Sequence, residues 1–306
     1  MSYTIVNVVS DTPEWEQERR NSIGASELAA VMNLSPYSTP LDVWKHKKGI
    51  DRQFDPLLSF IGHESEHIIE KWVHQFSGLN VQLEPAFMAR SVDYPFIHAS
   101  FDRWADGIPY QFKTAHHYTG HKWDEGIPTD IRVQVQGEML VSGAQRACVV
   151  VWIGGREFRL FWEDRDDRFI REQLIPAAEE LWQRVLNDNP PPASTIAEVN
   201  EITTEDRPVD LSETAFETFE RITVLNSDIK EQEQERDALK VALAQYVGTA
   251  DTLMRDGQKI ATWKQQKGRV GFDKEGFGLD HPHMLAKYTR IGAPFRVLRA
   301  SKTKEK

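Results

Sequence analysis

Cysteine is almost absent from this sequence of 306 residues, and the single Cys148 cannot form a disulfide within the chain. One unpaired cysteine is typical of a reducing compartment, and a chain of this length buries a sizeable core without crosslinks. Long apolar runs are also missing, because the longest, Ala147–Ile153, has the length of one strand and cannot span a bilayer. The N-terminal residues lack the basic and apolar segments of a signal peptide. We therefore expect a cytoplasmic protein without a membrane association.

An excess of positive charge is missing as well. Lys and Arg number 37 against 47 Asp and Glu, which gives a formal net charge of -10. This balance argues against a general nucleic-acid coat, whose affinity comes from broad neutralisation of phosphates. It does not exclude an enzyme that holds DNA in a local basic channel, because net charge says little about the local field.

The residues that are present form mixed helical and strand patterns over residues 1–190. Helices are expected at 15–20, 26–32, from 39 onward, and at 56–76, 130–141 and 166–186. Strands are expected at 80–84, 86–89, 97–102, 109–113, 147–153 and 157–162. These alternating patterns predict an α/β domain.

Three prolines at 190–192 end this first region, since proline cannot continue a helix. The polar stretch that follows predicts a linker over 191–209. A C-terminal region over 210–306 then combines a long helix, a β-hairpin and a closing strand, expected at 210–246, 252–263 and 295–299.

A small group of polar residues could carry chemistry. Asp102 ends one predicted strand, and Gln111 and Lys113 flank Phe112 on the next. Because side chains alternate along a strand, Gln111 and Lys113 share one face and Phe112 points to the other. A carboxylate and a second oxygen can hold Mg²⁺, and a lysine can stabilise the charge that develops on a phosphate. This pattern suits phosphodiester hydrolysis, although the same residues also fit an exposed pair of strands.

Five blocks of sequence, in order along positions 15–145, resemble the YqaJ-type viral recombinases and the lambda exonuclease family of the PD-(D/E)XK nuclease superfamily. The blocks are Trp15–Arg19 with Ile23–Ser26, Leu34–Tyr37 with Trp44–Gly49, Gly62–Glu66, Ala99–Asp102 with Gln111–Lys113, and Val133–Gly137 with Val141–Gly143. The resemblance implies a PD-(D/E)XK nuclease-like α/β fold, with a central mixed sheet flanked by helices and a smaller α+β C-terminal region.

The resemblance also implies an activity. It implies a Mg²⁺-dependent exonuclease, for which Mn²⁺ can substitute, that resects double-stranded DNA ends from 5′ to 3′ for phage-type single-strand-annealing recombination. It further implies a ring-shaped homotrimer, a single-strand annealing protein as a partner, and the host cytoplasm as the location of a phage-encoded chain.

The same resemblance implies roles for individual residues. The implied metal ligands are Asp102, Gln111, Glu66 and the backbone carbonyl of Phe112. The implied catalytic residues are Lys113, Glu66, Gln134 and Gln111. Arg19 and Ser26 would bind the 5′-phosphate at the DNA end, a task that suits an arginine and a helix N-terminus. Without the resemblance, Arg19 is a surface arginine and Ser26 a helix cap.

Gln111 departs from the family pattern, which has an acidic residue at this position. An amide oxygen can bind a metal but brings no charge, so the affinity for Mg²⁺ should fall. The chain could be a substituted, inactive version, a variant that holds metal with Glu66 and Asp102, or a protein that kept DNA binding and lost catalysis. The alternative function is therefore a non-cleaving protein that binds DNA ends or recruits a partner.

A second motif competes for the predicted helix over 56–76. The residues His63-Glu64-Ser65-Glu66-His67 match the H-E-x-x-H pattern of zinc proteases, in which two histidines on one helix face hold the metal. No third ligand motif follows, and we regard this function as the least favoured. The C-terminal region would either stabilise the nuclease domain or dock a partner.

Overall fold

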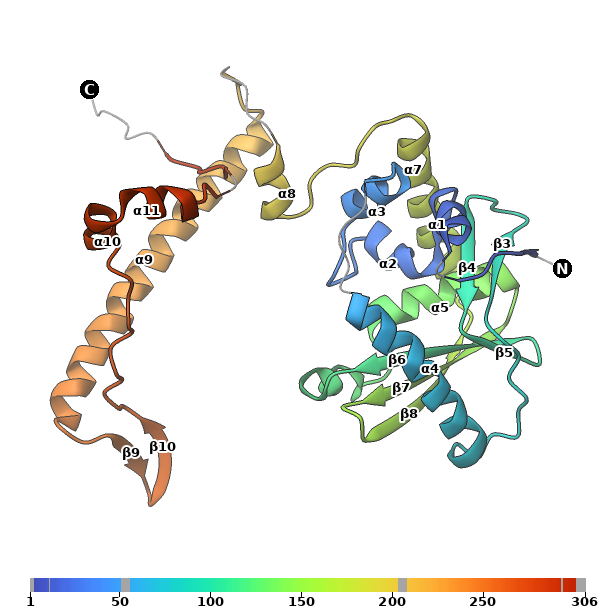
Figure 1. Ribbon diagram of the computed structural model, residues 1–306, viewed down its shortest axis with the longest axis horizontal. Helices are drawn as coiled ribbons and strands as arrows, with labels where there is room; N and C mark the ends of the chain where they lie inside the picture. The colour runs from blue at the N-terminus through green and yellow to red at the C-terminus, as the bar shows by residue number, and fades with distance from the viewer. Residues whose placement is uncertain (1–2, 11, 51–55, 203–207, 293, 301–306) are drawn as a thin grey trace. The chain divides into compact units, whose positions relative to one another are not determined.

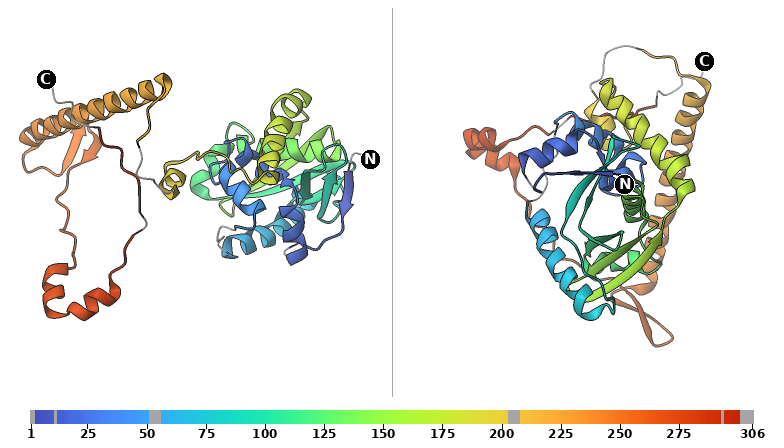
Figure 2. Two further views of the ribbon diagram at one scale, coloured as in Figure 1. Left: turned by 90° about the horizontal axis from the view of Figure 1, so that it is seen from above. Right: turned by 90° about the vertical axis from the view of Figure 1, so that its right-hand side faces the viewer.

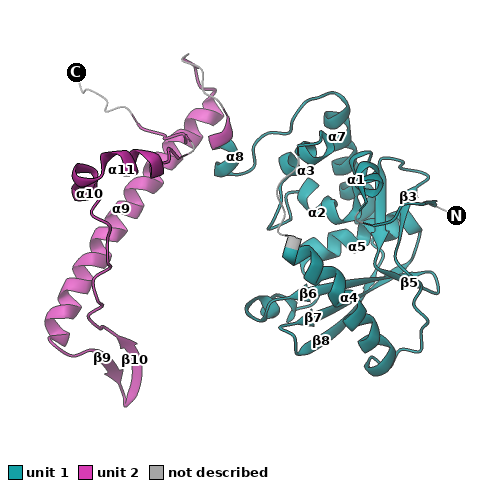
Figure 3. Ribbon diagram, in the orientation of Figure 1, with its two compact units in different colours: residues 1–199 teal, residues 200–306 magenta. Residues whose placement is uncertain are grey.

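The computed structural model describes residues 3–10, 12–50, 56–202, 208–292 and 294–300. The chain divides into two compact units, residues 1–199 and residues 200–306 (Figure 3). Within the described residues, no helix has both the length and the apolar character needed to cross a membrane.

Unit 1 opens with short helices that the sequence caps explicitly. They are α1 (Pro13–Arg20), the 3-10 turn η1 (Ala25–Glu27), α2 (Leu28–Val31) and α3 (Pro40–Lys47). The side chains of Thr12 and Thr39 accept hydrogen bonds from the first turns of α1 and α3. A proline starts each of these two helices, where its missing N–H costs nothing. The helices predicted at 15–20, 26–32 and from 39 onward are confirmed.

Two four-stranded sheets form the centre of unit 1. The first has the order β1 (Tyr3–Val6), β3 (Phe87–Ser91), β4 (Ile97–Phe101) and β2 (Ile23–Gly24). The second has the order β5 (Arg103–Ala105), β6 (Ile108–Ala115), β7 (Arg146–Ile153) and β8 (Glu157–Asp164). Strands β2 and β4, and β6 and β7, pair in parallel, and the other pairs are antiparallel. The predicted mixed sheet is confirmed, and the chain passes from one sheet to the other at Asp102.

Two helices cover opposite faces of the second sheet. Helix α4 (Pro56–Phe76) has the predicted bounds and lies along one face, and α5 (Thr129–Ser142) lies on the other (Figures 1 and 2). The side chains that pack with α4 include Tyr110, Phe112, Cys148 and Val150. Those that pack with α5 include Ala147, Val149, Val151 and Ile153. Because side chains alternate along β6, Phe112 points toward α4, and its neighbours Gln111 and Lys113 lie on the α5 side of the sheet.

Helix α5 is buried along nine consecutive residues, Val133–Val141. A helix buried on all sides is normally apolar throughout, yet this one carries Gln134, Gln136 and Glu138. Gln136 is tied to the end of β8, since its amide nitrogen donates to the carbonyl of Asp164 at 2.9 Å. Gly137 allows the close approach of η1 and α2, because a Cβ there would collide with Leu28. The polar residues of α5 therefore face specific partners.

Unit 1 closes with further helical segments. They are the 3-10 segment η2 (His117–Trp123), α6 (Asp167–Phe169), a π-helical turn η3 (Ile170–Leu174), α7 (Ile175–Leu186) and α8 (Ile196–Glu201), which crosses the boundary between the two units. Helix α8 lies within the predicted linker over 191–209, and its Glu198 is buried and accepts a hydrogen bond from Thr39. The strand predicted at 80–84 is wrong, because only Glu84 pairs, in an isolated bridge with Trp104.

Unit 2 consists of α9 (Glu213–Val247), a hairpin of β9 (Thr252–Arg255) and β10 (Gln258–Thr262), α10 (Lys274–Asp280) and α11 (Pro282–Tyr288). The predicted long helix and hairpin are confirmed. The strand predicted at 295–299 is wrong, since these residues have no regular structure. None of the described side chains of unit 2 is buried, so this unit does not build a core from its own residues.

Candidate active site

One cleft of about 610 Å³ brings together residues from distant parts of unit 1. Its lining includes the predicted catalytic and metal-binding side chains Glu66, Asp102, Gln111, Lys113 and Gln134. It also includes Arg19 and Ser26, which were predicted to bind a 5′-phosphate. Side chains that the sequence places more than a hundred residues apart therefore face a common space.

Asp102 lies at the step between β4 and β5, at the edge of the second sheet. Its Oδ2 accepts a hydrogen bond from the backbone N–H of Phe112 at 2.7 Å and another from the side-chain nitrogen of Gln111. Burial raises the pKa of Asp102 above its usual range, although Lys113 acts in the opposite direction. The buried carboxylic acid of Asp102 is therefore harder to ionise than one exposed to water.

A chain of hydrogen bonds leads from Lys113 to Asp102 on the α5 side of the sheet. Lys113 Nζ donates to Gln134 Oε1 at 2.9 Å, and Gln134 Nε2 donates to Gln111 Oε1 at 2.8 Å. Gln111 Nε2 in turn donates to Asp102 and, at 3.4 Å, to the carbonyl oxygen of Phe112. The nitrogen of Gln111, and not its oxygen, therefore faces two of the predicted metal ligands.

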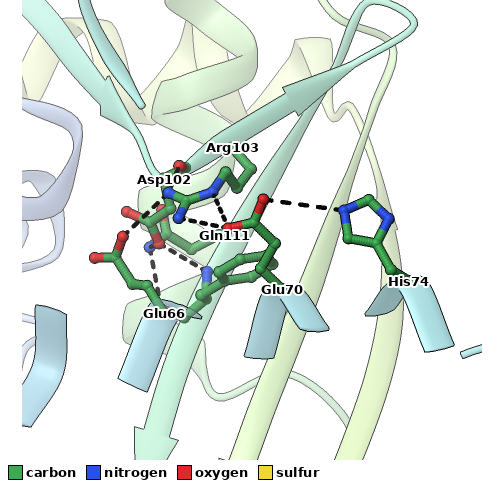
Figure 4. A network of polar contacts seen from close by, with 7 residues as sticks. Glu66, Glu70, His74, Asp102, Arg103 and Gln111 are labelled. Atoms are coloured by element: carbon green, nitrogen blue, oxygen red, sulfur yellow. Dashed lines mark hydrogen bonds and ion pairs between the residues drawn. The ribbon is translucent and has the colours of Figure 1, made fainter. Parts of the chain in front are cut away.

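Glu66 reaches the site from α4, on the opposite side of the sheet. Arg103 lies between Glu66 and Glu70, with Nη1 at 3.3 Å from Glu66 Oε2 and Nη2 at 2.8 Å from Glu70 Oε2 (Figure 4). Burial, together with the nearby charge of Asp102, raises the pKa of Glu66 to about 7. Arg103 thus partly compensates the charge of a predicted catalytic carboxylate.

Glu138 is a site residue that the sequence did not reveal. It lies one helical turn after Gln134 on α5, is 1% exposed, and accepts a hydrogen bond from Gln134 Nε2 at 2.9 Å. Its second oxygen is buried and has no hydrogen-bond partner among the residues that the structure describes. Burial and the charge of Asp102 raise the pKa of Glu138 to about 8. The only signal in the sequence was the spacing of four from Gln134, which places both side chains on one face of a helix.

Arg19 and Ser26, the residues predicted to bind a 5′-phosphate, lie close to a pair of buried charges. Arg19 lies in the last turn of α1 and stacks over the ring of Trp15, with Cζ 4.6 Å from the ring centroid, and Ser26 lies exposed in η1. Below them, Glu27 Oε2 accepts from the backbone N–H of Gly24 at 2.7 Å and pairs with Lys47. These contacts fix the turn that carries Ser26 next to the end of α1.

His98 of β4 also lines the cleft and was not predicted from the sequence. Its Nδ1 lies 2.9 Å from the hydroxyl of Ser22. Burial lowers the pKa of His98 to about 3, so the imidazole is neutral near pH 7. A Cβ at Gly24 would lie 3.0 Å from His98 Nε2, and a glycine therefore permits this approach.

The zinc-protease motif does not form a comparable site. His63, Glu64 and His67 are exposed on α4. Over the described part of the chain, no group of three or more His, Cys, Asp or Glu side chains is arranged to hold a metal ion. Glu66, which lies between the two histidines in the sequence, is the carboxylate of this motif that lines the cleft.

Residues 14–145, which contain all of these cleft residues, match the YqaJ-like viral recombinase domain family. This segment is therefore similar to YqaJ-like viral recombinase domains. The chain is also 28% identical over 244 residues to the uncharacterized protein YqaJ of Bacillus subtilis (strain 168), an overlap of 74% of this chain and 75% of that protein. The matched segment thus covers most of unit 1 and includes most of the residues that line its cleft.

The structure is also similar to solved structures of other proteins. An alkaline exonuclease from Laribacter hongkongensis matches with a TM-score of 0.47 and 15% identity, over 58% of this chain and 94% of the other. A phage related exonuclease from Haemophilus somnus 129PT matches with a TM-score of 0.43 and 14% identity, over 55% of this chain and 96% of the other.

The oxygen atoms at this site fit a divalent cation, provided that the side chain of Gln111 changes its orientation. Two carboxylates, those of Glu66 and Asp102, and the carbonyl of Phe112 are hard oxygen ligands of the kind that Mg²⁺ and Mn²⁺ prefer. Burial raises the pKa of both carboxylic acids, and for Glu66 the charge of Asp102 adds to this effect; a bound cation would stabilise the two buried carboxylates. Gln111 can complete this set only if it turns its oxygen toward Asp102.

Proposed function

We propose that this chain is a nuclease that acts on the ends of linear double-stranded DNA and resects one strand from 5′ to 3′. The observation that carries the proposal is the shared cleft, in which Arg19 and Ser26 lie beside Asp102 and Lys113. A terminal phosphate held by the first pair would leave the adjacent phosphodiester near the second. In phage-type recombination, such resection exposes a strand for annealing.

Each residue has a distinct task in this proposal. Arg19 and the N-terminus of η1 bind the 5′-phosphate, because a guanidinium and free backbone N–H groups both favour an anion. Lys113 stabilises negative charge on the scissile phosphate, and Gln134 orients Lys113 through their hydrogen bond. Glu66, Asp102, Phe112 and Gln111 would hold Mg²⁺ or Mn²⁺. When bound, the cation supplies an activated water and polarises the phosphate.

The proposed exonuclease is tested by digestion of a linear duplex with a 5′-phosphate, in Mg²⁺, by this chain and by its Gln111→Glu variant. We expect Gln111→Glu to release nucleotides from the 5′-terminated strand at least as fast as the parent chain. Lys113→Ala should abolish cleavage in both backgrounds and retain binding to the DNA end. If neither the parent chain nor Gln111→Glu degrades the duplex, the nuclease proposal is wrong.

A second function is favoured by one observation, the orientation of Gln111. With its nitrogen toward Asp102, the site lacks one oxygen ligand, and the chain would bind DNA ends without cutting them. Binding of a phosphorylated end without digestion by the parent chain, together with digestion by Gln111→Glu, would favour this function.

We also propose that the chain forms a homotrimer in the host cytoplasm and works with a single-strand annealing protein. A ring around the duplex would keep the enzyme on its substrate between cleavage steps. Sedimentation at micromolar concentration tests the trimer, and a monomer alone under these conditions would contradict it.

A further inference from the structure

The direction of the hydrogen-bond chain from Lys113 to Asp102 is fixed from both ends. An ammonium group has donors and no acceptor, so the atom of Gln134 that faces Lys113 must be its oxygen. Asp102 Oδ2 already accepts from the backbone N–H of Phe112 and so acts as an acceptor, and the atom of Gln111 that faces it must therefore be the nitrogen. The contact between the two amides, from Gln134 Nε2 to Gln111 Oε1 at 2.8 Å, satisfies both requirements at once.

Glu138 favours the same orientation of the Gln134 amide. Gln134 Nε2 donates both to Gln111 and to Glu138 Oε1, so the nitrogen of Gln134 has two acceptors on this side. The three side chains that meet at this point of the hydrogen-bond chain are buried, with exposed fractions of 3% for Gln111, 7% for Gln134 and 1% for Glu138. Because these side chains are largely shielded from water, a lost partner is costly, and a turn of one amide favours a matching turn of the other.

A divalent cation at Asp102 and the carbonyl of Phe112 would require the opposite orientation of Gln111. Its nitrogen now lies next to both of these oxygens, and a cation needs an oxygen in its place. If Gln111 turned, its nitrogen would face Gln134 and would need an acceptor there. Gln134 would then have to turn as well, and its nitrogen would face the ammonium of Lys113, which leaves two donors opposed.

We infer that Lys113, acting through Gln134, holds the Gln111 amide with its nitrogen toward Asp102 and Phe112. Lys113 and Gln134 are then positioning residues that oppose the binding of a divalent cation. The inference rests on the proposed function, in that it takes Asp102 and Phe112 as cation ligands. A glutamate at position 111 meets no such opposition, because either carboxylate oxygen can accept from Gln134 while the other binds the cation. The acidic residue of the family pattern therefore supplies an orientation-independent ligand as well as a charge.

The test is binding of Mn²⁺ to the full chain, followed by the loss of the electron paramagnetic resonance signal of the free ion. Gln134→Met breaks the hydrogen-bond chain without changing the charge of the site. We expect it to tighten Mn²⁺ binding at least about tenfold in the parent chain, the effect of about one buried hydrogen bond. In the Gln111→Glu background the same substitution should change binding less than about twofold. Equal changes in the two backgrounds would overturn the inference.

Lys113→Met provides a second route, because Lys113 is less buried than Gln134 and its replacement retains the shape of the stem. Loss of the positive charge tightens Mn²⁺ binding in both backgrounds, and release of the amides tightens it further in the parent chain alone. The inference expects a gain at least about tenfold larger in the parent chain than in the Gln111→Glu background. Additive effects would contradict it.

The controls separate this inference from the proposed function. Each variant is compared with the parent chain by circular dichroism and melting temperature, so that a folding defect is recognised. If Gln111→Glu binds Mn²⁺ and the two backgrounds respond equally, the positioning inference fails and the proposed cation site stands. If no variant binds Mn²⁺, including Gln111→Glu, both the inference and the proposed cation site fail.

Discussion

The ammonium group of Lys47 lies 2.5 Å from the carboxylate of Glu27, and the lysine side chain is fully buried. Lys47 also donates to the backbone carbonyl of Arg19 at 2.7 Å. The pair therefore joins the end of α1, the turn η1 and the helix α3, which together carry Arg19 and Ser26. This buried ion pair therefore fixes the segments that carry the two residues predicted to bind a 5′-phosphate.

Replacement of Lys47 by Met should lower the free energy of unfolding by about 3–5 kcal/mol near pH 7, because it leaves the Glu27 carboxylate buried without its partner. The measurement is urea unfolding followed by circular dichroism. Lys48→Met is the matched control, since the ion pair of Lys48 with Asp188 is partly exposed and should contribute less than about 1 kcal/mol. A loss of similar size in both variants would contradict this role of the buried pair.

The same pair predicts a pH dependence. Burial alone would raise the pKa of Glu27, but Lys47 and Arg19 lower it from 4.5 to about 2. Because the folded pKa lies below the ordinary value, the stabilisation is complete above about pH 4.5 and is lost as the pH falls toward 2. In the Lys47→Met variant the free energy of unfolding should therefore fall less steeply over this range. An unchanged slope would show that other carboxylates dominate acid unfolding.

Glu138 has the opposite dependence on pH. Its folded pKa of about 8 lies above the ordinary value of 4.5, so its contribution is complete below about pH 4.5 and is lost as the pH rises through 8. Glu138→Gln resembles the protonated acid and should raise the melting temperature relative to the parent chain at pH 9, with little difference at pH 5. Glu179→Gln, an exposed position on α7, should have no such effect. A lower melting temperature for Glu138→Gln at pH 9 would contradict the prediction.

Arg19→Ala should reduce the preference for a 5′-phosphorylated DNA end over a 5′-hydroxyl end by about tenfold, because a charge-assisted hydrogen bond contributes about 1.5–3 kcal/mol. The ratio of the two dissociation constants, measured by fluorescence anisotropy, reports this effect. Arg20→Ala provides a neighbouring control, since Arg20 is not among the residues that line the cleft. An unchanged ratio for Arg19→Ala would refute the proposed role.

Much of the fold could be predicted because it depends on local patterns. The bounds of α4, the hairpin of β7 and β8 and the long helix α9 follow from hydrophobic periodicity, glycine turns and capping residues. The strands predicted at 80–84 and 295–299 failed for a different reason. A short apolar run becomes a strand only where another strand offers its backbone, and that partner is not encoded in the run itself.

The sequence by itself determined which residue types meet in the cleft, since alternation along β6 places Gln111 and Lys113 on one face and the order of motifs predicts their neighbours. Only the tertiary structure decided how these groups orient one another. Glu138 enters the site because α5 is buried against the sheet, and Arg103 pairs with Glu66 because α4 crosses the other face. The direction of the Gln111 amide depends on a donor at Lys113 and an acceptor at Asp102, and hydrogen-bond direction is a property of groups in contact, not of their spacing along the chain.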